Sequence, residues 1–411
     1  MEAFRGGTSA YLVDLVRHTP HVEHHVAIPP PGREAAGSGA ARDGRAEQAL
    51  VDLGATVHAV DMRRSPAHPA NAGAVVALRR LVRVLRPAAV HCHSAIGGAL
   101  GRIAAAGTGV PALYMPHALP EGRASLLVEK ALRPLTWRLV AISESEAQQA
   151  ETLGAAPASK VEVVRNGVDL DAAVSPIDVR EMAGVPEAAP LVGTTIRLVP
   201  QKAPLLFVAV CERVAIRRPD AHFVLAGEGP LQPQVEAAAR STALQGRWHR
   251  LPSLDPAAVA GQFDVFVLAT AFEGGPFAPL VAMRERTPVV LTDVVGNRDV
   301  VEHGRSGLLA PFDDPDAIAR LVVSLLDDPD LAERLAAGAR RRVEETFDVR
   351  RMGEAMERLY HEAACAPAWK PPRRRVSRRE GRPRRRKVGN RRTPPTDAAG
   401  FSAADPPQVQ R

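Results

Sequence analysis

Short apolar runs alternate with stretches of helical spacing along most of the chain. The apolar runs predict strands at 24–28, 56–62, 88–94, 111–117, 138–143 and 161–167, and a second series at 191–198, 221–227, 264–270, 288–294 and 306–312. Helical spacing of apolar residues predicts helices over 8–19, 45–54, 72–86, 204–218 and 316–328. Strands that alternate with helices are typical of parallel sheets. The pattern therefore predicts an α/β protein.

The two series of strands indicate two domains. Between them lies a turn-rich stretch at 165–190 without strong periodicity, and we place the linker around 170–190. The 411 residues exceed what a single hydrophobic core usually organises. We therefore expect an N-terminal domain over 1–170 and a C-terminal domain over 171–365, whose last helix returns to the N-terminal domain.

The remaining segment, 366–411, is rich in Arg and Pro and carries a net charge of +11, whereas the whole chain carries +7 and the rest therefore −4. With so few apolar residues it is expected to be disordered. It either has no specific role or makes a weak contact with an anionic membrane surface. Nucleic-acid binding rests on this segment alone, and no specific nucleic-acid partner is expected.

The cysteines and the apolar runs indicate the compartment. Three distant cysteines without a CxxC pair argue against a disulfide framework, and no run reaches the length of a membrane span. Met1 is not followed by a signal peptide. We therefore expect a cytoplasmic protein, with peripheral contact at the inner membrane face as an option.

Several polar residues have simple structural interpretations. Ser143 and Glu146 form a capping-box pattern at the start of a helix, and Asp314 before Pro315 is typical of an N-cap. Asp169 and Asp171 lie in the turn-rich linker, where metal binding is not favoured. No metal site is predicted elsewhere.

The stretch "FEGGPFAPLVAM" at 272–283 is the first candidate for chemistry. Its glycines and proline end the strand at Glu273, and a helix is expected to begin near Phe277. Such a turn points the first N–H groups of the helix toward a ligand above the strand. From this stretch alone, Glu273 is either a ligand-binding carboxylate or a solvated loop residue.

Other candidates follow strands in the same way. Arg197 and Lys202 lie five residues apart after a strand, a pairing that suits a diphosphate. His117 follows another strand between two prolines, and it could position a hydroxyl, accept its proton, or be structural. Gly6 and Gly7 precede the first helix and allow close approach to a phosphate, or form a simple loop.

Taken in their order along the chain, these motifs resemble those of the retaining nucleotide-sugar glycosyltransferases of family 4, the glycogen-synthase-like group. Three further stretches carry the same resemblance: "RNGVD", "LAGEGPL" and "PVVLTDVVGNRDVVEHGRSGLLAPF". The resemblance covers about residues 4–360 and implies the GT-B fold, in which two Rossmann-like domains face a cleft. It implies a nucleotide sugar as co-substrate, no metal or other cofactor, and a glycan, lipid-linked or small-molecule acceptor.

The resemblance also implies roles for single residues. Arg197 and Lys202 would neutralise the departing diphosphate, and Glu273 would face the donor sugar. The backbone of Gly274, Gly275, Pro276 and Phe277 would meet the sugar and phosphates. Gly7, with Gly6 beside it, would approach the diphosphate from the N-terminal domain. His117 would lie on the acceptor side.

The sequence departs from the family pattern at three places. Val281 stands where relatives carry a second glutamate that faces the ribose, and Glu285 would compensate only partly. Ala203 replaces the glycine that usually follows the lysine. The family also opens with a strand before the two glycines, and this chain has only "MEAFR", so we expect the central strand of the N-terminal sheet to be missing.

These departures keep a second interpretation open beside the glycosyltransferase. It is a non-catalytic glycosyltransferase-like subunit or a decayed enzyme, motivated by Val281 and the short N-terminus. A nucleotide-sugar 2-epimerase shares the two-domain fold, but its set of acids and histidines in the first domain is not apparent.

Overall fold

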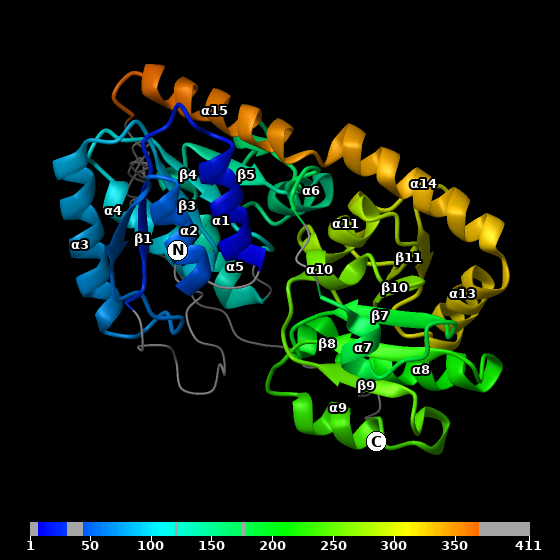
Figure 1. Ribbon diagram of the computed structural model, residues 1–411. Helices are drawn as coiled ribbons and strands as arrows, with labels where there is room; N and C mark the ends of the chain where they lie inside the picture. Colours follow the sequence, from blue (N-terminus) through cyan, green and yellow to red (C-terminus); the bar gives the residue numbers. More distant parts are fainter. Residues whose placement is uncertain (1–6, 31–43, 120–121, 174–176, 370–411) are drawn as a thin grey trace, which may run out of the picture. The chain divides into compact units, whose positions relative to one another are not determined.

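The computed structural model describes residues 7–30, 44–119, 122–173 and 177–369. Gly6 and nearly all of the basic segment lie outside these ranges. Within them, the predicted α/β architecture with parallel sheets in two domains is confirmed (Figure 1).

The C-terminal domain is built on a six-stranded parallel sheet in the order β12-β11-β10-β7-β8-β9. Its strands are β7 (Leu191–Thr195), β8 (His222–Ala226), β9 (Trp248–Leu251), β10 (Val265–Leu268), β11 (Val289–Thr292) and β12 (Leu308–Ala310). Only β9 was not predicted from the sequence. It is an edge strand whose sequence, "WHRL", has polar His and Arg between its two apolar residues, so it has no apolar run to indicate it.

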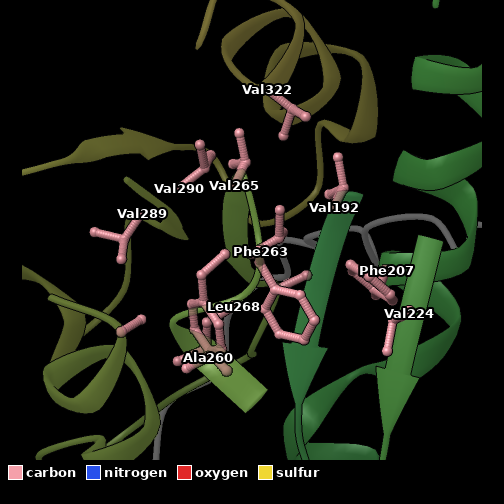
Figure 2. Close-up of a cluster of buried hydrophobic side chains, with 14 of the residues drawn as sticks. Val192, Phe207, Val224, Ala260, Phe263, Val265, Leu268, Val289, Val290 and Val322 are labelled. Carbon is pink, nitrogen blue, oxygen red and sulfur yellow. The ribbon is translucent and has the colours of Figure 1, made fainter. Parts of the chain in front are cut away.

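Helices cover this sheet and complete its core. They are α7 (Val179–Ala183), α8 (Pro204–Arg217), α9 (Gln232–Ala238), α10 (Pro256–Ala260), α11 (Phe277–Arg284), α12 (Asn297–Val300), α13 (Pro315–Asp327) and α14 (Pro329–Thr346). Figure 2 shows side chains of this core that come from the sheet and from the helices, among them Val265 of β10, Phe207 of α8 and Val322 of α13. Asp314 caps α13 as predicted, because its carboxylate accepts from the N–H of Ala317 at 2.8 Å.

The N-terminal domain holds two parallel groups of strands. The first pairs β1 (His25–Ile28) with β2 (Thr56–Ala59), and the second has the order β3-β4-β5-β6, with β3 (Val90–His93), β4 (Ala112–Met115), β5 (Arg138–Ala141) and β6 (Val161–Val163). The helices are α1 (Gly7–Arg17), α2 (Gly44–Asp52), α3 (Ala70–Leu85), α4 (Ala95–Ala105), α5 (Arg123–Leu132) and α6 (Glu144–Thr152).

Between β1 and β3 the described residues form no strand pairing. A cavity of about 240 Å³ lies there, lined mainly by apolar residues of α1, α3 and both strands. The absence of a central strand from this sheet stays a prediction.

The last helix, α15 (Val349–Cys365), contributes to the core of the N-terminal domain. Its residues Val349, Met352 and Met356 belong to the same buried cluster as Tyr11 and Leu12 of α1. Among the described residues, no helix is both long enough and apolar enough to cross a membrane.

Candidate active site

The strand order of the C-terminal sheet determines where a ligand can bind. The chain runs from β7 through β8 to β9 on one side, and then returns to β10 on the other side of β7. Where strand order reverses in an open parallel sheet, the connections leave in opposite directions and open a crevice at the carboxyl ends. Lys202 follows β7 and Glu273 follows β10, so both lie at this point.

Gln201 brings these two segments together. It lies in a short 3-10 turn, η3 (Pro200–Lys202), and its carbonyl oxygen accepts from the N–H of Ala271 and the hydroxyl of Thr270, both at 2.9 Å. Its side-chain amide donates to the carbonyl of Phe272 at 3.1 Å. The turn after β7 is thereby fixed to the end of β10.

Lys202 and Glu273 form an ion pair as a result. The Nζ atom of Lys202 lies 2.6 Å from Oε1 of Glu273, and the two side chains are only 18 % and 6 % exposed. A short, largely buried pair of this kind is a strong charge-assisted hydrogen bond. The two residues come from separate motifs in the sequence, and the structure brings them into contact with one another.

The loop before α12 fixes the backbone of Glu273. The N–H of Glu273 donates to the carbonyl of Val295 at 3.1 Å. Gly296 has φ +86°, and a Cβ atom there would overlap the carbonyl of Glu273. Only glycine satisfies both conditions, so Gly296 is a site residue that the sequence analysis quoted within a motif but did not single out.

The glycines after Glu273 lie against three parts of the N-terminal domain. A Cβ atom on Gly274 would lie 3.0 Å from the backbone nitrogen of Ala118, and one on Gly275 would meet Ile142 at 3.2 Å. The side chain of Asn166 donates to the carbonyl of Gly275 at 2.8 Å. The two glycines therefore permit close approach of two loops. Asn166 is a further site residue, which was quoted within the stretch "RNGVD" but given no role of its own.

The helix that follows begins at Phe277, as predicted. Its N-cap is Pro276, which supplies no side-chain hydrogen bond to the first turn. The free N–H groups of such a turn are suited to an anion. The start of α11 thus lies beside the Lys202–Glu273 pair, at the carboxyl end of β10.

Arg197 lies just after β7 on an exposed part of the chain. The flanking N–H groups of Ile196 and Leu198 donate to the carbonyls of Ala226 and Glu228, at 3.1 and 2.9 Å. Gly227 lies so close to this segment that a Cβ atom would overlap the carbonyl of Ile196. The glycine-rich loop after β8 therefore sets the path of the backbone that carries Arg197.

His117 follows β4 and has φ +59°. Its Nε2 atom lies 3.0 Å from Nδ1 of His93, and its ring contacts that of Tyr11 edge to face. Burial lowers the pKa of His117 to about 4, because the charged imidazolium loses its hydration. The ring is therefore neutral at pH 7 and a weak base, which favours hydrogen bonding over proton abstraction.

Three other residues were considered for binding the nucleotide sugar, and their surroundings in the structure do not indicate such a role. Val281 is 1 % exposed and belongs to the core of the C-terminal sheet. Glu285, the carboxylate considered as a substitute, lies 2.6 Å from Nε of Arg284. Gly7 is the first residue of α1, where a Cβ atom would meet nothing within 4 Å. The roles of these residues toward a donor stay predictions.

Among the described residues, no three His, Cys, Asp or Glu side chains are grouped so as to hold a metal ion. Asp169 instead accepts from the N–H of Asp171 at 3.0 Å within the linker.

Comparison with known families and proteins gives a consistent result. The sequence profile described as Glycosyltransferase Family 4 matches residues 5–172, and the profile described as Glycosyl transferases group 1 matches residues 189–328. Together they cover about three quarters of the chain.

Individual proteins are similar at moderate identity. The UDP-Gal:alpha-D-GlcNAc-diphosphoundecaprenol alpha-1,3-galactosyltransferase of Escherichia coli is 27% identical over 70% of this chain and 78% of its own length. The alpha-maltose-1-phosphate synthase of Mycolicibacterium smegmatis is 29% identical over 67% and 79%. Among solved structures, Anabaena Alr3699/HepE in complex with UDP and glucose has a TM-score of 0.74 at 17% identity, covering 88% of this chain and 98% of that one.

The fold and the site define an enzyme that transfers sugars from nucleotide sugars. The chain belongs to the glycosyltransferases of family 4, which have the GT-B fold.

Proposed function

We propose that this glycosyltransferase retains the configuration of the transferred sugar and works without a metal ion. It moves the sugar from a nucleoside diphosphate to a hydroxyl of a glycan, a lipid-linked saccharide or a small molecule. The observation that supports this most is the Lys202–Glu273 pair at the switch point, next to the uncapped start of α11.

The charges at this point suit a departing diphosphate. When the bond between the anomeric carbon and the diphosphate breaks, negative charge collects on the phosphate oxygens. Lys202, Arg197 and the first N–H groups of α11 are the fixed positive groups that would stabilise it, in place of a metal ion. Glu273 would then turn from Lys202 to the hydroxyls of the donor sugar.

The acceptor would approach from the side of His117. Gly274 contacts the His117–Ala118 peptide, so the loop after β10, which would bind the donor, is adjacent to the loop after β4, which would face the acceptor. These are called the donor loop and the acceptor loop. Neutral His117 is suited to hold the acceptor hydroxyl by a hydrogen bond. A weak contact of segment 366–411 with an anionic membrane remains part of the proposal, on the basis of its net charge of +11.

Turnover of nucleotide sugars tests the function. The purified chain is incubated with UDP-, GDP- and ADP-linked sugars, with UDP-glucose and UDP-galactose first because similar proteins are named for UDP and UDP-Gal. We expect nucleotide release from at least one donor, undiminished by EDTA, and a product with the donor's anomeric configuration by NMR.

Activity that EDTA abolishes and Mg²⁺ or Mn²⁺ restores would refute metal independence. A product of inverted configuration would refute retention. If no donor is turned over, the non-catalytic interpretation that Val281 motivates is favoured instead.

A further inference from the structure

Glu146 is a buried carboxylate with two unusual partners. Its carboxylate was expected to complete a capping box at the start of α6, and Ser143 does accept from the N–H of Glu146 at 3.1 Å. The carboxylate itself, however, reaches outside the helix. Oε2 accepts from the N–H of Ile142, and Oε1 accepts from the N–H of Ala118, both at 2.8 Å. The reciprocal half of the capping box is therefore replaced by a contact with the loop after β4.

The residues held by this contact have a strained backbone. His117 has φ +59° and Ala118 has φ +121°, and residues other than glycine seldom adopt such backbone angles. Conformations of this kind persist only where neighbouring groups enforce them. The bond from Ala118 to Glu146 is a charge-assisted constraint of that type, and Gly274 packs on the other atoms of the same peptide.

We propose that Glu146 is a positioning residue for sugar transfer, acting through the His117–Ala118 turn. By holding the N–H of Ala118, it fixes the ring of His117 on the acceptor side and the surface on which Gly274 of the donor loop rests. This inference rests on the proposed function, because it assigns Glu146 a task in the same site.

The charge state of Glu146 makes the inference testable. The pKa of Glu146 is raised to about 7, chiefly by burial and to a smaller extent by Asp299 of α12, against the opposing effect of the two N–H donors. Tyr114 of β4 also interacts electrostatically with Glu146, and it stays neutral because its pKa is well above 10. His117, in the turn that Glu146 holds, is neutral as well, with a pKa of about 4. A protonated carboxyl group presents an O–H to one of the two N–H donors, so one bond weakens below pH 7.

The main experiment follows His117 and needs no turnover. NMR spectra of protein labelled at its histidines are recorded from pH 5.5 to 8.5, and a His117→Asn variant assigns the ring. We expect the His117 signals of the unaltered protein to shift with an apparent midpoint near 7. In Glu146→Gln this shift should be lost, because an amide offers only one acceptor and does not titrate. Glu144→Gln is the matched control, since Glu144 lies in the same turn but is exposed and paired with Arg165 at 2.6 Å.

Kinetics on an accepted donor supply the second readout. We expect Glu146→Gln to lower kcat/KM at pH 8 about tenfold and to remove the limb of the pH profile near 7, with Glu144→Gln unchanged. Ala118→Gly in the Glu146→Gln background should restore part of the activity, because glycine adopts φ +121° without strain. If Glu146→Gln does not fold, Ala118→Gly alone should reduce the sensitivity of His117 to pH.

A His117 signal that titrates identically in Glu146→Gln and in the unaltered protein would overturn the inference, as would equal effects of Glu144→Gln and Glu146→Gln. Lack of turnover with every donor would count against the proposed function, while the NMR result would still decide the role of Glu146.

Discussion

Gly227 offers a severe test of how the structure positions Arg197. A methyl group on this residue would overlap the carbonyl oxygen of Ile196, one residue before Arg197, and φ is +153°. Forced overpacking and an unfavourable backbone conformation each cost about 1–3 kcal/mol. We therefore expect Gly227→Ala to lower the free energy of unfolding by about 3 kcal/mol in sum.

Gly246→Ala is the matched control for this variant. Gly246 also has positive φ, +74°, but a Cβ atom there would meet nothing within 4 Å. It should lose only the cost of left-handed backbone, about 1–2 kcal/mol. At roughly 2–4 °C per kcal/mol, the melting temperature should fall by about 6–12 °C in Gly227→Ala and clearly less in Gly246→Ala.

The kinetic readout separates stability from positioning. Displacement of the backbone at Ile196 moves Arg197, and small misplacements of charged groups in an active site reduce rates strongly. We expect kcat/KM for the nucleotide sugar to fall at least tenfold in Gly227→Ala and to stay within twofold in Gly246→Ala, both measured well below their melting temperatures. If the two variants lose the same stability and both keep their activity, the contact with Ile196 does not position Arg197.

Three further predictions concern burial and pairing. Val281→Glu places a carboxylate at a position that is 1 % exposed, so the melting temperature should fall. The new carboxylate should also bind the ribose and lower the KM for the nucleotide sugar about tenfold. An unchanged or higher KM would contradict the prediction that position 281 faces the ribose. Burial raises the pKa of Glu146 from 4.5 to about 7, so the protonated carboxyl group stabilises the folded protein fully below pH 4.5, and this stabilisation is lost as the pH rises through 7. Between pH 4.5 and 8, the free energy of unfolding of the unaltered protein, measured with denaturant, should fall by up to about 3 kcal/mol relative to that of Glu146→Gln. A difference that stays constant with pH would refute this. Five or six apolar residues with strand propensity, added before residue 1, should fill the cavity between β1 and β3 and raise the melting temperature. A polar segment of equal length should not raise it. Equal effects of the two segments would show that the cavity does not bind an added strand.

Local patterns predicted most elements of this fold. The start of α11 at Phe277 follows from Gly and Pro, which act on the nearest residues. The strand ends were less accurate: β7 ends at Thr195 and β10 at Leu268, before the predicted ends at 198 and Glu273. The edge strand β9 was missed because strand pairing, and not apolar burial, defines it. Parallel sheets and two domains followed from the alternation of strands and helices.

The site was predicted as a set of residues but not as a geometry. Lys202 and Glu273 are 71 residues apart, and only Gln201 and the switch point bring them together. Glu146 matches a capping box in the sequence, yet its carboxylate bonds to Ala118, 28 residues away. Contacts between distant segments depend on the packing of whole elements, which no local pattern encodes.

The most direct test of the account is nucleotide release by Lys202→Ala. Removing the ammonium leaves Glu273 without its partner and takes away one of the two cations, Lys202 and Arg197, proposed to stabilise the departing diphosphate. Turnover of the accepted nucleotide sugar should therefore fall about 10²–10³-fold. Lys130→Ala, a change at an exposed lysine of α5, should leave turnover unchanged. If Lys202→Ala keeps at least half of the activity, the Lys202–Glu273 pair is not the centre of sugar transfer.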